Sequence, residues 1–271
     1  MHRGSQPTDD GNLILTPEEK EQLVKEAPQV ATFIHPYMMG KEVIRREPRY
    51  CLWLVGADPA ILLKCQPVLE RIEKVRQFRL NSRKAATRKK ADSPMLFDEN
   101  QQPDTHFIAI PKVSSENRRY IPIEFMTPET IVGDTVYVIE NASLYEFGVM
   151  TSCVHMAWMR AVCGRLEMRY RYSNTVVYNN FTWPEPSDLQ HQQIEIAAQK
   201  ILDERAKLPG IDFLAMYGTA LDTVFTGLAT AHRENDRAVM AAYGFSQDMT
   251  EPEIVAELMK RYQAKLAVVK G

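Results

Sequence analysis

The stretch at residues 164–173, GRLEMRYRYS, places arginine and glutamate side chains at a spacing that could recognise an anionic partner. Charged and apolar residues alternate along it after the glycine. Because successive side chains of a β-strand point to opposite faces, the alternation predicts one strand with a charged and an apolar face. The charged parity holds Arg165, Glu167, Arg169 and Arg171, and the apolar parity holds Leu166, Met168, Tyr170 and Tyr172, predicted to pack behind the reading strand.

Two interpretations of the charged face remain open. In one, the glutamate and the arginines simply pair with each other on a solvated face. In the other, the face reads DNA base edges, because arginine matches guanine O6 and N7 and a carboxylate accepts from the cytosine N4 amino group. Glu167 and Arg169 would lie about 7 Å apart along a strand, which suits the two partners of one C·G pair. Since a carboxylate is unfavourable beside phosphates, Glu167 favours base reading.

The segment at 113–122, VSSENRRYIP, places two hydroxyl groups and two arginines in a turn between predicted strands. A capped, solvated turn explains this pattern equally well. The functional interpretation is a loop that approaches nucleic acid. The residues predicted to contact bases are then Glu167, Arg169, Arg171, Ser115, Arg118 and Arg119.

The window 71–90 carries nine basic residues and a single acidic one, a net charge of +8, although the whole chain carries only −2. Local charge rather than the total sets the attraction to a polyanion. A solvated helix face is the alternative, but such faces usually mix both signs. We therefore predict phosphate contacts, which give affinity and salt dependence without sequence reading. The residues predicted to make them are Arg79, Ser82, Arg83, Lys84, Arg88 and Lys89.

The elements that must position these residues change character along the chain. Short strand patterns and helices share the region up to about residue 185, and from Asp188 onward the pattern is helical. Trp183-Pro184-Glu185-Pro186 reads as the boundary, and residues 1–12 read as a disordered lead-in. The predicted fold class is α+β, with a mixed α/β part at 13–185 followed by a small all-α part at 186–271.

Several classes of site are missing from the sequence. There is no GxGxxG or GxxxxGK[ST] phosphate loop, no HExxH motif and no GxSxG nucleophile motif. The four cysteines form no CxxC pair, and no apolar run reaches the roughly 18 residues of a membrane span. We predict no catalytic residue and no metal site in this chain, no membrane partner, and a cytoplasmic location.

Five stretches together carry a resemblance to a known family. They are RYCLWL, FRLNSRKAATRKKADSP, IPKVSSENRRYIP, GVMTSCVHMAWMRAVCGRLEMRYRYS and YNNFTWPEP. In this order they resemble the C-terminal part of MmeI-like type IIL restriction–modification enzymes, which fuse an endonuclease, an adenine-N6 DNA methyltransferase, a target-recognition domain and a helical C-terminal domain. The resemblance covers about residues 11–245.

The resemblance implies that 13–185 is a DNA target-recognition domain and 186–271 the family's C-terminal domain. It also implies that Glu167 and Arg169 jointly specify one base pair, with C rather than G on the methylated strand. Double-stranded DNA and the methyltransferase and endonuclease domains of the parent enzyme are the implied partners. Thr182 departs from the proline that relatives often carry there.

The methyltransferase and nuclease motifs of that family are absent: there is no NPP[YF] and no glycine-rich S-adenosylmethionine loop. The chain by itself is therefore expected neither to methylate nor to cleave DNA. S-adenosylmethionine is expected in the catalytic domain of the parent protein and no cofactor in this chain. The alternative function is a protein-interaction module, in which the helical tail binds a partner and the basic segment is only solvated.

Overall fold

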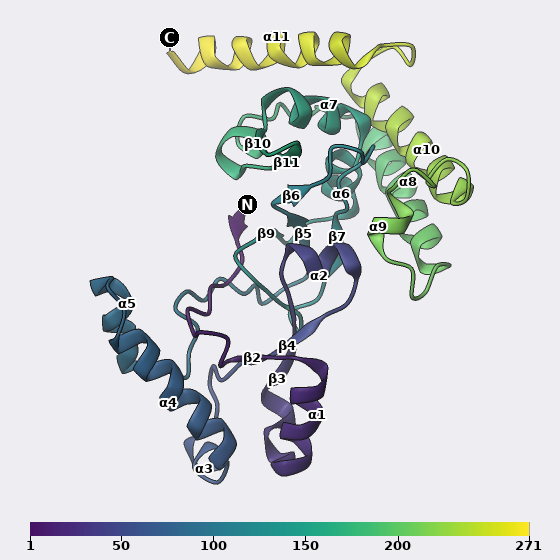
Figure 1. Ribbon diagram of the computed structural model, residues 1–271. Helices are drawn as coiled ribbons and strands as arrows, with labels where there is room; N and C mark the ends of the chain where they lie inside the picture. The colour runs from purple at the N-terminus through teal and green to yellow at the C-terminus, as the bar shows by residue number, and fades with distance from the viewer. Residues whose placement is uncertain (271) are drawn as a thin grey trace.

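A computed structural model describes residues 1–270, with side chains to residue 267 (Figure 1). The α-helices are α1 (Pro17–Glu26), α2 (Gly40–Arg45), α3 (Pro59–Leu62), α4 (Gln66–Leu80), α5 (Ala85–Lys89), α6 (Leu144–Met150), α7 (Cys153–Val162), α8 (Asp188–Ala206), α9 (Phe213–Met216), α10 (Thr226–Tyr243) and α11 (Glu251–Lys270). The strands are β1 (His2–Arg3), β2 (Ile14–Leu15), β3 (Ile34–Met38), β4 (Arg49–Leu52), β5 (Phe107–Pro111), β6 (Val113–Ser114), β7 (Glu124–Met126), β8 (Ile131–Val132), β9 (Val136–Glu140), β10 (Gly164–Leu166) and β11 (Arg169–Arg171). The mixed α/β part followed by helices confirms the predicted α+β class.

The strands form three small sheets. Their orders are β1-β9-β5-β7, β2-β4-β3-β8 and β10-β11-β6. All pairings are antiparallel except that of β3 with β8. Figure 1 shows α1, α3, α4 and α5 at one end of the molecule and α7, α8, α10 and α11 at the other, with the sheets between them.

Several helix boundaries follow from signals in the local sequence. Thr16 accepts from the backbone N–H of Glu19, whose carboxylate accepts from the Thr16 N–H, completing the capping box of α1. At α11 the Thr250 N–H and the Thr250 hydroxyl both donate to the Glu253 carboxylate, which is one half of a capping box. Pro67 lies in the first turn of α4, where its missing N–H removes no helical hydrogen bond.

Residues 143–164 have a largely helical sequence pattern that ends at a glycine, but they form two helices. Ser152 caps α7 by accepting from the His155 N–H, so α6 ends at Met150 and α7 starts anew at Cys153. Gly164 is not a helix C-cap, because it opens strand β10.

Residues 1–12 are ordered, contrary to the predicted lead-in. β1 pairs with β9, and Ser5 and Gln6 form single bridges to Gly133 and Glu99. The segment is polar and so lacks the hydrophobic pattern of an element, but its backbone groups are satisfied by strands distant in sequence. Its order is therefore a tertiary effect.

The hydrophobic core does not follow the boundary predicted at 183–186. One cluster belongs to the end of the molecule that holds α1 and α4, and joins residues 13–97 with Ile131. A larger cluster runs from Ile108 through α6 and α7 to Leu258 in α11, on both sides of that boundary. The composition of the sequence therefore changes near residue 185, but the segments on both sides of this point contribute to one hydrophobic core.

Polar contacts join the helical part to the rest of this larger core. Asp236 accepts from the Tyr120 hydroxyl and from the Cys153 N–H, both at 2.6 Å. Arg205 donates to the carbonyl of Ile123 at 2.6 Å. Because Asp236, Tyr120 and Arg205 are buried, breaking any of the contacts would leave an unsatisfied buried polar atom.

Gly148 of α6 allows the close approach of α8 and α10. A Cβ there would lie 2.6 Å from Ile194 Cγ2 and 2.9 Å from Asn235 Oδ1.

Replacing glycine by alanine inside a helix normally stabilises a protein by about 1 kcal/mol, but overpacking a core costs about 1–3 kcal/mol. We expect Gly148→Ala to lower the unfolding free energy measured by urea denaturation. Gly227→Ala in α10 is the matched control: the nearest atoms to its Cβ belong to the end of the flexible Glu204 side chain, which can turn aside, so stability should hold or rise slightly.

Among the described residues, no helix is both long and apolar enough to cross a membrane.

Candidate nucleic-acid interface

The stretch at 164–173 forms a β-hairpin, so the prediction of one continuous alternating strand is wrong. β10 and β11 pair antiparallel, and Glu167 and Met168 form the two-residue turn between them. Glu167 has φ +57°, a left-handed conformation that glycine adopts most readily. A non-glycine residue held there stores backbone strain, as Thr8, Asp10, Arg46 and Asn141 also do.

The turn changes which side chains share a face. Leu166 pairs directly with Arg169, and Gly164 with Arg171, while Arg165 pairs with Tyr170. Directly opposed residues of an antiparallel pair point to the same side. Leu166 therefore lies on the face of Arg169, which the alternation assigned to the opposite side. Arg165 belongs to the other face, and its guanidinium stacks 4.2 Å from the centre of the Tyr170 ring.

The apolar residues of the hairpin divide in the same way. Tyr170 and Tyr172 are buried, as predicted for side chains behind the reading strand. Leu166 and Met168 are 42% and 70% exposed, so the prediction that they pack behind it is wrong. The reason is the turn, which keeps both residues at the far end of the hairpin, away from the core.

Glu167 and Arg169 form an ion pair, with Arg169 Nη2 2.8 Å from Glu167 Oε2. Their side chains are 77% and 47% exposed. Exposed pairs of this kind contribute only about 0–1 kcal/mol. Each side chain can therefore leave this ion pair and bind a stronger hydrogen-bonding partner with little loss of free energy.

The 113–122 segment lies beside the hairpin. β6 pairs with β11 through Val113↔Arg171 and Ser114↔Tyr170, which completes the three-stranded sheet. A cleft of about 560 Å³ opens next to this sheet. Three of the predicted base-reading residues, Ser115, Arg118 and Arg169, line it together.

Basic residues that sequence reasoning missed line the same cleft. Lys41 and Arg45 come from α2, and Arg49 from the start of β4. Arg49 is paired with Glu42 at 3.2 Å. The sequence does show basic residues clustered over 41–49, in the stretch GKEVIRREPR that starts at Gly40. Only the fold, however, brings this cluster next to the hairpin.

Arg118 is only 8% exposed and donates from Nη1 to the Ser114 hydroxyl at 3.1 Å. Burial lowers the pKa of its guanidinium from the ordinary value, but arginine stays charged under any normal condition. It places a fixed positive charge in the wall of the cleft. Arg119 points elsewhere, pairing with Asp222 at 3.6 Å.

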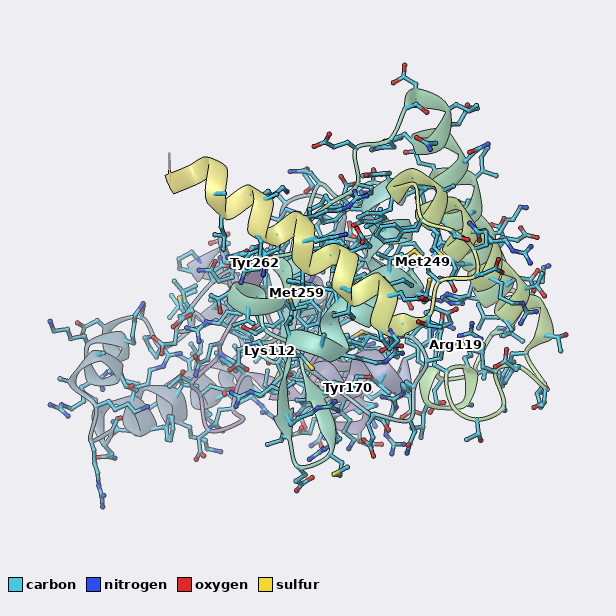
Figure 2. All side chains as sticks on the ribbon, turned by 90° about the horizontal axis from the view of Figure 1, so that it is seen from above. Lys112, Arg119, Tyr170, Met249, Met259 and Tyr262 are labelled. Carbon is cyan, nitrogen blue, oxygen red and sulfur yellow. The ribbon has the colours of Figure 1, made fainter. Side chains whose placement is uncertain are left out.

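Lys112 is a further basic residue that the sequence did not single out. Its ammonium lies 4.7 Å from the centre of the Tyr137 ring, and burial lowers its pKa, with the nearby charges of Arg3 and Arg171 acting in the same direction and Asp134 opposing them. In Figure 2, Lys112 and Arg119 appear on opposite sides of Tyr170. Positive charge therefore flanks the hairpin on the Arg171 side as well as in the cleft.

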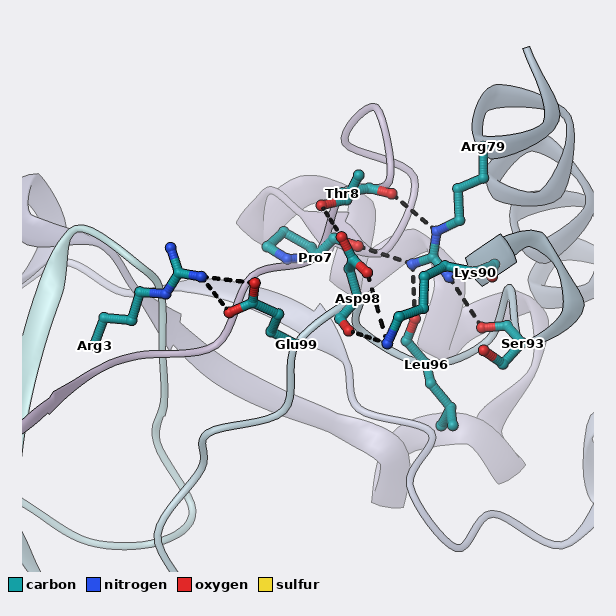
Figure 3. A network of polar contacts seen from close by, with 9 residues as sticks. All are labelled: Arg3, Pro7, Thr8, Arg79, Lys90, Ser93, Leu96, Asp98 and Glu99. Carbon is teal, nitrogen blue, oxygen red and sulfur yellow. Dashed lines mark hydrogen bonds and ion pairs between the residues drawn. The ribbon is translucent and has the colours of Figure 1, made fainter. Parts of the chain in front are cut away.

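Arg79 has a structural role in place of the predicted phosphate contact. Its side chain is fully buried, and its guanidinium donates to five backbone carbonyls (Figure 3). Burial lowers its pKa. No donor remains for a phosphate, because all of them hold the chain together. The acceptors are the carbonyls of Pro7 (2.8 Å), Thr8 (3.0 Å), Lys90 (3.0 Å), Ser93 (3.0 Å) and Leu96 (2.7 Å).

The other predicted phosphate contacts lie on and before α5. Arg83, Lys84 and Lys89 are exposed. Arg88, also exposed, donates to the carbonyls of Ser82 and Arg83 at 2.8 and 2.9 Å, and so closes the turn between α4 and α5. Figure 1 shows this segment, the α5 arm, at one side of the molecule and apart from β10 and β11. The two basic regions therefore do not merge into one patch.

Thr182, the departure from the family pattern, is 5% exposed. The Tyr243 hydroxyl donates to its carbonyl oxygen at 2.6 Å, which anchors the turn before Trp183 on α10. In the described part of the chain, no three His, Cys, Asp or Glu side chains come together in a way that could hold a metal ion.

Two models of protein families match consecutive parts of this chain and together cover residues 1–269. Residues 1–185 match the family described as MmeI, target recognition domain, and residues 186–269 match MmeI, C-terminal domain. DNA methyltransferase A of Bacillus subtilis (strain 168) is 34% identical over 263 residues, which are 97% of this chain and 30% of that protein.

A solved structure of the type IIL restriction–modification enzyme MmeI in complex with DNA is similar in fold. Its TM-score is 0.94 and its sequence identity 41%, covering 98% of this chain and 35% of that one. The chain thus spans about a third of the length of both relatives.

Proposed function

The chain belongs to the MmeI family across its target recognition and C-terminal domains, and from this premise we propose that it recognises a specific DNA sequence for a restriction–modification enzyme. The observation that carries the proposal is the three-stranded sheet β10-β11-β6. It brings two segments about fifty residues apart to one cleft, which five basic side chains line. A two-stranded ribbon of this size can enter the major groove of DNA.

Glu167 and Arg169 are proposed to read one base pair. On binding, their ion pair would open, so that Arg169 donates to guanine O6 and N7 and Glu167 accepts from cytosine N4. The weak, exposed pair of the free protein supports this exchange, because little stability is lost when it opens. Ser115, Arg118 and Arg171 are proposed to contact neighbouring base edges. Arg119 is a weaker candidate, since it does not line the cleft and its guanidinium lies 3.6 Å from the Asp222 carboxylate.

The α5 arm is proposed to hold phosphates at a distance from the hairpin. Ser82, Arg83, Lys84, Arg88 and Lys89 remain the candidates, and Arg79 supports the arm from inside. Contacts at two separated regions would fix the register of the protein along the duplex.

Catalysis is proposed to lie in the part of the enzyme that this chain does not include. The relatives are about three times as long, and a methyltransferase domain there would bind S-adenosylmethionine and take the adenine out of the stack. The role of this chain would be to position that domain on the chosen sequence.

A salt titration tests DNA binding. The logarithm of the binding constant for a duplex should fall linearly with the logarithm of the salt concentration. Each phosphate contact should add about 0.9 to the steepness of that slope. Lys84→Ala should weaken all sequences about equally and reduce the slope by about 1. Lys200→Ala is the control, because Lys200 is paired with Glu234 on the helical part and should leave both quantities unchanged.

Absence of binding at low salt, even with the methyltransferase part supplied, would contradict the proposal. That result would favour the alternative function, a protein-interaction module with a solvated basic segment.

A further inference from the structure

Leu166 is an exposed apolar residue within a charged surface. It is 42% exposed and lies at the end of β10. A single exposed leucine is common on protein surfaces and needs no explanation by itself. The register of the hairpin makes this one informative.

Leu166 is the direct cross-strand neighbour of Arg169. Such neighbours have Cβ atoms about 4.5–5.5 Å apart and point to the same side. The next pair along the hairpin is Gly164 with Arg171, and a Cβ on Gly164 would meet nothing closer than 3.8 Å. The reading face therefore has two arginines along β11 and, along β10, one apolar side chain followed by open space.

The chemistry of the major groove contains one apolar group, the 5-methyl of thymine. Successive base pairs are about 3.4 Å apart, so two side chains about 5 Å apart reach the same or adjacent pairs. We propose that Leu166 recognises the 5-methyl group of a thymine in the base pair next to the one that Glu167 and Arg169 read. This inference rests on the proposed function, and adds a specificity-determining residue to it.

Met168 provides the internal comparison. It is more exposed than Leu166, at 70%, but belongs to the turn and has no partner in the β10–β11 register. If exposure alone were sufficient for contact with a thymine methyl group, Met168 would be the better candidate. If the position beside Arg169 is what matters, Leu166 is the better candidate.

The test uses this chain together with its methyltransferase part and a duplex carrying the recognised sequence, identified from the positions that the enzyme methylates. Each thymine is replaced in turn by deoxyuridine, which differs only by the methyl group. One replacement, next to the pair assigned to Glu167 and Arg169, should weaken binding about fourfold, the effect of one buried methyl group. Leu166→Ala should bind the thymine and deoxyuridine duplexes equally, whereas Leu166→Met and the control Met168→Ala should keep the difference.

The outcomes separate this inference from the proposed function. Failure of the wild-type protein to prefer its own sequence over a random duplex would overturn the proposed function. Normal preference with no effect of deoxyuridine at the adjacent pair, or a recognised sequence with G·C on both sides, would overturn the role of Leu166 alone. Loss of the methyl effect in Met168→Ala but not in Leu166→Ala would assign the contact to the turn and also overturn it.

Discussion

The double exchange Glu167→Lys with Arg169→Asp, made in the complete enzyme, is expected to change the preferred base pair at one position of the recognised sequence from C·G to G·C. The two side chains exchange their roles as hydrogen-bond acceptor and donor, so the complementary base pair becomes the favourable one. A good bidentate contact discriminates by about 1–3 kcal/mol, or roughly 5- to 150-fold. The exchange leaves a non-glycine residue at the left-handed position 167, so the strain of the turn changes little.

Methylation of a plasmid library with that position randomised measures this preference directly. The matched control is the exchange Lys200→Glu with Glu234→Lys. It also reverses an exposed ion pair, of 2.6 Å, but lies on α8 and α10. The control should methylate the original sequence. Unchanged methylated sequences in the Glu167 and Arg169 exchange would show that another surface reads this base pair.

Replacing Arg79 by methionine is expected to destabilise the protein by at least about 3 kcal/mol. Methionine replaces the aliphatic stem of the side chain but donates nothing, so five backbone carbonyls lose a charged donor at once. Each buried acceptor left unsatisfied costs about 1–3 kcal/mol, less where water enters. Because two of the carbonyls belong to Pro7 and Thr8, the N-terminal segment should loosen first.

Urea denaturation with hydrogen exchange on residues 1–12 would measure both effects. Arg83→Ala is the comparison, since Arg83 is an exposed residue of the same basic segment. It should change the unfolding free energy by no more than about 0.5 kcal/mol while weakening DNA binding. An Arg79→Met protein of normal stability with reduced DNA affinity would restore the phosphate contact first predicted for Arg79.

The contrast between Arg79 and Arg83 shows where charge patterns lose information. Both arginines belong to the same basic window, and nothing in their local sequence separates them. One is fully buried by carbonyls from Pro7 to Leu96, and the other faces solvent. Whether an arginine of this window is buried or exposed depends on which distant backbone segments pack against its side of α4.

The hairpin carries the same lesson for β-structure. Alternation in GRLEMRYRYS correctly indicated strand and correctly placed Tyr170 and Tyr172 inside. It does not reveal a turn at Glu167–Met168, because neither residue is the glycine or asparagine that normally marks one. A two-residue turn reverses the parity of everything before it, which moved Leu166 onto the face of Arg169 and Arg165 off it.

Features that depend on residue type or on near neighbours along the chain could be predicted from the sequence. They include the capping box at Thr16, the contact of Thr250 with Glu253, the α+β order of elements, the basic window and the family motifs. Features that depend on pairing between distant segments could be seen only in the folded chain. The tertiary structure ordered residues 1–12, joined both sequence parts in one core, removed Arg79 from the surface and brought α2, β6 and the hairpin to one cleft. The reason is physical: backbone hydrogen bonds and burial over long separations are set by packing, and the local pattern does not encode which partner a group will meet.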